Sequence, residues 1–128
     1  MSFLKSAFFL VFISTMTACI HKTDLSSIKA VSFSGDIQPI LAGNCSMSGC
    51  HSDDHGSGSG GHELFPLSTY SEVMDHGEIK SGNARSSKLY RVVTNREGGI
   101  MPPSPRPILT EDQMKQIYLW IEQGAKDN

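Results

Sequence analysis

The chain contains few cysteines, little excess charge and no long apolar segment near its start. Three cysteines among 128 residues cannot close into a complete set of disulfides, because the count is odd. A formal net charge of −2 argues against a nucleic-acid-binding protein, which needs a basic face. The N-terminal apolar run covers only residues 7–13, whereas a membrane-spanning helix needs about 20 apolar residues. Together with the chain length, these properties indicate one small domain behind a short N-terminal segment.

Residues 1–18 have the pattern of an export signal. Lys5 supplies a positive charge ahead of the apolar run, and the sequence M-T-A leads directly into Cys19. This ending resembles the lipobox of bacterial lipoproteins, although methionine stands where that motif usually has leucine or valine. The resemblance implies cleavage before Cys19 and acylation of its thiol. The alternative is ordinary cleavage near Ala18, which leaves Cys19 as a spare thiol.

An acylated Cys19 implies a lipid-anchored protein that faces the periplasm, outside the cytoplasm. Ile20 takes the place of the aspartate that commonly marks inner-membrane retention in lipoproteins, which favours the outer membrane. Residues 20–33 carry three lysine or aspartate charges and three serines, and they show no sustained periodicity. We therefore expect three segments: a signal peptide at 1–18, a tether at 19–33 and a folded domain at 34–126.

Residues 45–51 read C-S-M-S-G-C-H. Two thiols followed at once by an imidazole suit covalent haem attachment, because each thiol adds to one vinyl group and the histidine then binds the iron. Four residues separate the cysteines instead of the usual two, and Gly49 eases the longer loop that this requires. We expect Cys45 and Cys50 to hold the haem and His51 to be the proximal ligand. The alternative is a pair of structural thiols or a Cys45–Cys50 disulfide, which leaves His51 without a task.

A methionine is the best candidate for the sixth iron ligand, since a thioether favours reduced iron and raises the potential. Met101 follows two glycines, which let the backbone approach closely, and precedes a run of prolines that stiffens the loop. We expect Met101 to bind the iron opposite His51. His62 and His76 are the rival ligands, and the alternative for Met101 is packing within a proline-rich turn.

Residues 52–63 form a polar, glycine-rich insertion without core-forming side chains, and we expect a surface loop there. His55 and His62, with neighbouring carboxylates, offer ligands for a divalent metal. The alternative is a solvated loop with no bound ion.

The clearest helical signal begins at Thr110, an N-cap that forms a capping box with Gln113. Apolar residues then repeat at i, i+3, i+4 and i+7, and Gly124 offers a stop. Trp120 lies beside this stripe, where it either widens the buried face or covers the edge of the haem.

Three shorter helices complete the expected pattern. Residues 34–42, with Asp36 as N-cap, predict a helix that leads into the haem-binding loop. Two more are expected over 70–74 and over 86–93, the latter capped by Ser86. No strand pattern of comparable strength is present, so the domain is expected to be all-α.

With these residues in place, the chain resembles the small class I cytochromes c, especially the planctomycete-type domains. The resemblance covers residues 34–126. It rests on D-I-Q-P-I-L ahead of the cysteines, G-N followed by S-K-L-Y, M-P-P, a threonine-capped helix and the final W-I-E-Q-G-A. It implies a cytochrome c fold with N- and C-terminal helices packed around one covalent haem c. At their crossing, Ala42 and Gly43 are expected to let Tyr118 or Trp120 approach.

The resemblance also implies a function: a mono-haem c-type cytochrome that exchanges single electrons with redox partner proteins, and not an enzyme. Two alternatives come from other classes. If Met101 does not bind the iron, the open sixth position makes the protein a haem sensor or a peroxidase-like enzyme. If no haem is attached, the Cys/His residues make it a metal-binding lipoprotein.

Overall fold

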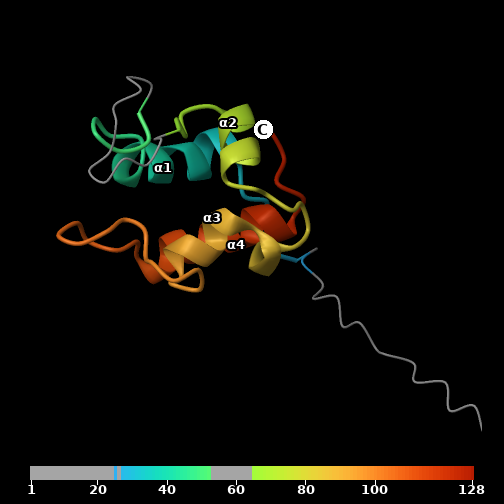
Figure 1. Ribbon diagram of the computed structural model, residues 1–128. Coiled ribbons are helices and arrows are strands. Elements are labelled where there is room, and N and C mark those ends of the chain that lie inside the picture. Colours follow the sequence, from blue (N-terminus) through green and yellow to red (C-terminus); the bar gives the residue numbers. More distant parts are fainter. Residues whose placement is uncertain (1–24, 26, 53–64) are drawn as a thin grey trace, which may run out of the picture.

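The computed structural model describes residue 25 and residues 27–52 and 65–128 (Figure 1). The proposed signal peptide, Cys19 and the histidines of the glycine-rich insertion lie outside these residues. The described part is helical and contains no strand, which confirms the all-α prediction. None of its helices combines the length and apolar content needed to cross a bilayer.

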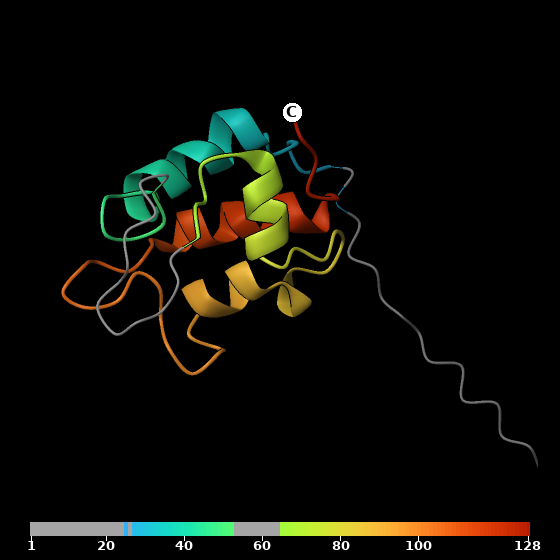
Figure 2. The same cartoon turned by 45° about the horizontal axis from the view of Figure 1, so that its top comes forward.

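The described residues contain six short helical elements: the π-helix η1 (Phe33–Ile37), α1 (Gln38–Asn44), α2 (Tyr70–His76), the 3₁₀-helix η2 (Ala84–Ser86), α3 (Lys88–Val93) and α4 (Glu111–Glu122). In Figure 1, α1 and α2 lie above α3 and α4. Figure 2 shows α2 crossing in front of α4 at a steep angle. The 45–52 loop and the long 94–110 loop project at the same end in both views.

The first helix begins earlier than expected, and the expected N-cap at Asp36 is wrong. Ser32 occupies the cap position, and its Oγ accepts from the Gly35 amide at 3.1 Å. Asp36 instead reaches back, and its Oδ2 accepts from the Ser32 amide at 2.8 Å. The reason is that Phe33 is buried in the core, which draws the preceding residue into the cap.

The residues before η1, which we assigned to the end of the tether, pair with the C-terminal part of the chain. The side-chain amide of Gln123 forms hydrogen bonds to them through both of its polar atoms. Its Oε1 accepts from the Val31 amide at 2.8 Å, and its Nε2 donates to the Lys29 carbonyl at 3.2 Å. The Phe33 amide donates to Asn128 Oδ1 at 3.0 Å. We call this group the Gln123 clamp.

The two middle helices form, but α2 is longer than expected and α3 lacks the expected cap. Thr69 and Glu72 form a capping box at the start of α2, which ends at His76 instead of residue 74. The predicted cap Ser86 is wrong, because it belongs to η2 and α3 starts after Ser87. The buried Ser87 hydroxyl bonds the loop before it, donating to a backbone carbonyl at 3.0 Å and accepting from a backbone amide at 2.8 Å.

α4 forms as expected, and it positions the core. The Thr110–Gln113 capping box is present, with Gln113 Oε1 accepting from the Thr110 amide at 2.9 Å. The helix ends before Gly124, whose φ of +105° suits glycine. Trp120 is fully buried and widens the apolar face; its ring centroid lies 5.6 Å from that of Phe33.

Aromatic packing therefore joins α4 to η1, at the start of the first helical segment. The expected approach over Ala42 and Gly43 is wrong, since both residues are exposed and nothing lies within 4 Å of a Cβ built at Gly43. The small residues are not needed for close packing because the contact with α4 is made at the start of the first helical segment, through Phe33.

Candidate cofactor site

α1 ends in the 45–52 loop, which folds back on itself. The Cys50 amide donates to the Met47 carbonyl at 2.9 Å, and the His51 amide donates to the Cys45 carbonyl at 3.1 Å. Gly49 adopts a φ of +76°, a conformation that favours glycine. The four residues between the cysteines thus form a compact turn, which brings the backbone of His51 back to the backbone of Cys45.

Neither Cys45 nor Cys50 forms a disulfide. Cys45 is buried and Cys50 is half-buried. Burial, together with the nearby Cys50, raises the pKa of the Cys45 thiol to about 11. Cys45 is therefore a protonated, unpaired thiol at neutral pH in the cofactor-free protein.

His51 is held by the segment that follows the glycine-rich insertion. Its Nδ1 lies 2.9 Å from the Phe65 carbonyl oxygen. A carbonyl only accepts, so Nδ1 carries the proton and Nε2 keeps its lone pair. The Phe65 ring also packs on the imidazole, with centroids 4.9 Å apart. His51 therefore has one defined nitrogen available for a ligand, in a fixed ring orientation.

A second set of contacts fastens this segment to the 45–52 loop. The Leu67 amide donates to the His51 carbonyl at 3.1 Å. The Ser46 hydroxyl donates to the Leu67 carbonyl at 3.0 Å. The loop that presents the two thiols is therefore held by contacts distant in sequence, and its shape does not depend on its own turns alone.

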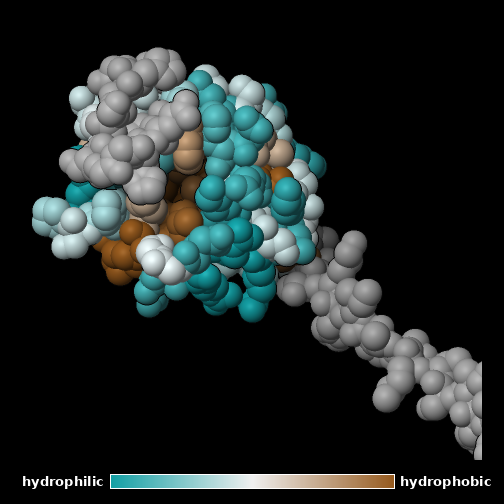
Figure 3. All heavy atoms as spheres, viewed as in Figure 1, coloured by the Kyte–Doolittle hydropathy of each residue, from teal (hydrophilic) through white to brown (hydrophobic). Residues whose placement is uncertain are grey.

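The thiols and the imidazole line a cavity of about 490 Å³, within the range of about 300–1,000 Å³ typical of cofactor pockets. Figure 3 shows apolar side chains gathered in a hollow on the side of the molecule where the two loops project. Most of the wall is apolar and comes from several elements: Phe65, Leu67, Leu89, Val92, Val93, Pro102 and Pro103.

Met101 lines the same cavity from the opposite part of the sequence. Its amide donates to the Val92 carbonyl at 3.0 Å, which ties the 94–110 loop to the end of α3. Met101 is 40% exposed, whereas a methionine that packs in a core is buried. The structure thus brings Cys45, Cys50, His51 and Met101 to one cavity.

His76, the rival ligand, also lines the cavity, so it does not simply face solvent. It ends α2 and stacks on Phe65, with ring centroids 4.7 Å apart. Its Nδ1 lies 4.0 Å from Asp75 Oδ2. Phe65 therefore contacts both imidazoles of the cavity, His51 and His76.

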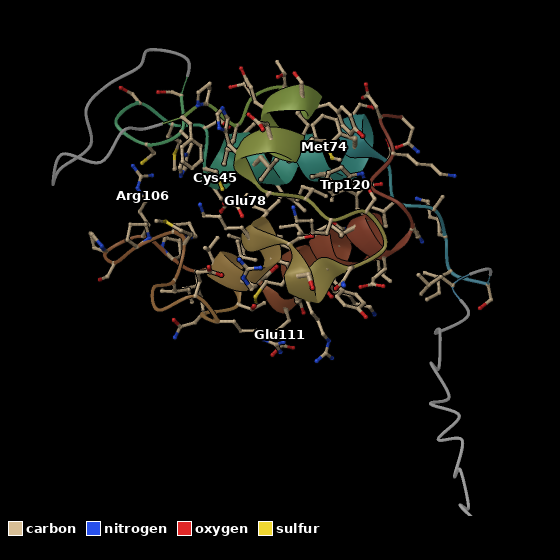
Figure 4. All side chains as sticks on the ribbon, turned by 45° about the vertical axis from the view of Figure 1, so that its right-hand side comes forward. Cys45, Met74, Glu78, Arg106, Glu111 and Trp120 are labelled. Carbon is tan, nitrogen blue, oxygen red and sulfur yellow. The ribbon has the colours of Figure 1, made fainter. Side chains whose placement is uncertain are left out.

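Sequence reasoning missed two residues of the site, Phe65 and Arg106. Phe65 acts on His51 through its backbone carbonyl, for which a sequence has no signal. Arg106 lines the cavity and places Nη1 3.0 Å from Met47 Sδ, while Figure 4 shows it on the side of the molecule that carries Cys45. A basic residue soon after the M-P-P motif was the available hint.

Among the residues that the structure describes, no group of three or more His, Cys, Asp or Glu side chains is placed to hold a metal ion directly. Comparisons with protein-family models, curated proteins and solved structures find no significant match to this chain.

Proposed function

We propose that this protein is a mono-haem c-type cytochrome that carries single electrons outside the cytoplasm. The observation that supports it most is the convergence of two thiols, one imidazole and one thioether on a single apolar cavity. The two thiols and the imidazole come from one seven-residue segment, whereas the thioether of Met101 comes from a different loop. A chance pair of cysteines beside a histidine gives no reason for a thioether to line the same cavity.

The residues present fit a haem group. The cavity is large enough for a cofactor, and its apolar wall suits a flat, mainly hydrophobic ring better than a hydrated ion. When bound, haem iron supplies reversible one-electron chemistry. Cys45 and Cys50 would hold the ring covalently through thioether bonds, and both thiols are free to form them.

The axial ligands follow from the donor atoms. His51 would bind through Nε2, since its Nδ1–H is held by the Phe65 carbonyl, and that hydrogen bond strengthens the imidazole as a donor. Met101 would supply the second protein ligand, a thioether that favours reduced iron. Two protein ligands leave no open position for a substrate, so the proposed role is that of a carrier and not of an enzyme.

The wider architecture belongs to the same proposal. A cytochrome c-like fold around the haem agrees with the helical order and with the aromatic contact between the first and last helical segments. Acylation of Cys19 would attach the domain to a bacterial membrane on the periplasmic side, and Ile20 favours the outer membrane. Its partners would be redox proteins, with no role for nucleic acid.

A second candidate ligand set is favoured by one observation, the position of His76 in the cavity wall. Iron bound by His51 and His76 would have a lower potential than iron bound by His51 and Met101. Both sets predict covalent haem and electron transfer, and they differ in the spectrum of the oxidised protein.

The test is an absorption spectrum, oxidised and reduced, of the full chain made in a host with cytochrome c maturation, followed by a pyridine haemochrome assay. We expect a c-type spectrum together with the weak long-wavelength band that the cytochrome c resemblance associates with a methionine–iron bond. Cys45→Ser and Cys50→Ser should each leave the haem on one thioether. Absence of covalent haem from the wild-type protein overturns the proposal.

A further inference from the structure

Two side chains join the two loops that contribute to the cavity wall. Arg106, on the 94–110 loop, donates from Nη1 to the Sδ atom of Met47 at 3.0 Å. Met47 lies between the two cysteines, and Arg106 lies five positions after Met101 in the chain. Figure 4 shows the Arg106 side chain rising from its loop towards the loop that carries Cys45. The contact therefore connects the haem-attachment loop to the loop of the sixth ligand.

Both partners are anchored through their backbones. The Met47 amide donates to the Cys45 carbonyl, and the Met47 carbonyl accepts from the Cys50 amide, both at 2.9 Å. The Arg106 amide donates to the Pro103 carbonyl at 3.1 Å, which closes a turn. Since Met47 belongs to the closed 45–52 turn, the contact can restrain the outer part of the 94–110 loop, where Arg106 lies.

We propose that Met47 and Arg106 form a clasp between the 45–52 loop and the 94–110 loop, and that Arg106 is a positioning residue for Met101. This inference rests on the proposed function. It also assigns a use to the unusual four-residue spacing, because Met47 is one of the residues that the longer loop contributes. The clasp holds the 94–110 loop against the 45–52 loop and so keeps the Met101 thioether at the cavity.

Met101 needs such support because few contacts of its own hold it in place. Its side chain is 40% exposed, and its backbone is tied to α3 by the single bond to Val92 described above. Pro102 is buried beside it, but the following residues 103–108 are all exposed. A loop of that kind opens readily unless its outer part is also held.

The experiment measures imidazole binding to the oxidised, haem-loaded full-length protein, with the long-wavelength methionine–iron band recorded at the same time. Imidazole competes with Met101 for the iron, so its apparent affinity reports how firmly the loop is closed. The variants are Arg106→Ala, Met47→Leu and the double variant. Met47→Leu keeps an apolar side chain of similar size and removes the sulfur. Arg85→Ala, in η2 and outside the cavity wall, is the matched control.

We expect each single variant to bind imidazole about three- to tenfold more tightly and to lose part of the band, since one hydrogen bond holds the clasp. The double variant should bind imidazole no more tightly than either single variant, because the two substitutions remove the same interaction. The control should match the wild type.

Wild-type affinity in both single variants overturns the clasp, and so do fully additive effects in the double variant. The haemochrome assay of the wild type separates the two levels of the argument. Covalent haem with unchanged imidazole binding refutes the clasp alone, whereas no covalent haem refutes the proposed function and the clasp with it. If Arg106→Ala does not fold, Met47→Leu decides the question.

Discussion

Replacing Trp120 with phenylalanine should destabilise the protein without changing the cofactor. The indole is fully buried among aromatic rings, with Tyr70 at a centroid distance of 6.4 Å, and its Nε1 donates to the Lys126 carbonyl at 3.0 Å. Phenylalanine removes that hydrogen bond and about three buried ring atoms, which together cost about 2–4 kcal/mol of unfolding free energy. For a domain of this size, the midpoint of thermal unfolding should fall by at least about 8 °C.

The spectrum should stay the same, because Trp120 is not part of the cavity wall. Figure 4 places it towards the other end of the molecule from Cys45 and Arg106. Thermal unfolding followed by circular dichroism measures the stability, and the haem absorption bands measure the site. Tyr118→Phe, on the same helix but half-buried, is the control and should change stability by less than about 0.5 kcal/mol. A shifted haem band in Trp120→Phe would show that the indole touches the cofactor, and it would refute this placement.

Three further predictions concern the ligand, a cap and the response to acid. Met101→Ala should abolish the long-wavelength band, lower the reduction potential and allow rapid carbon monoxide binding to the reduced protein; retention of the band would point to another ligand. Thr110→Ala removes one half of the α4 capping box and should cost about 1 kcal/mol in chemical denaturation, and an unchanged midpoint would contradict the cap. Backbone amides of Thr69 and Ser68 lower the pKa of Glu72, so this carboxylate adds stability above its ordinary pKa and loses it as the pH falls through the lowered value. Glu72→Gln should therefore unfold less steeply with acid than the wild type in a circular dichroism titration.

The local signals of the sequence predict the last helix best. Its capping box and its apolar spacing both depend on residues within a few positions, and the structure has both. The cap of the first helix was misplaced because the deciding residue, Phe33, is buried by aromatic side chains from distant segments. Asp36 carries a correct cap chemistry, but it acts one turn away from where the local pattern puts it.

The candidate site divides in the same way. The haem motif and the sixth-ligand candidate are readable because they need particular side chains at particular spacings, and both reach the cavity in the structure. The hydrogen-bond partner of His51 is a carbonyl, and every residue has one, so no pattern could single out Phe65. The contact between Met47 and Arg106 was equally hidden, since it joins two loops whose relative position comes only from the folded chain.

The Gln123 clamp fixes the end of the domain at which the chain before η1 enters it. It holds residues 29–31 against the end of α4, whereas the cavity opens between the two loops at the opposite end of the molecule (Figure 1). A lipid on Cys19 would therefore attach the domain to the membrane through the end opposite the cofactor cavity. The exposed edge of the haem would face away from the bilayer, towards proteins that diffuse in the aqueous compartment. Such an arrangement suits a carrier that serves soluble partners better than one that hands electrons to a site buried in its own membrane.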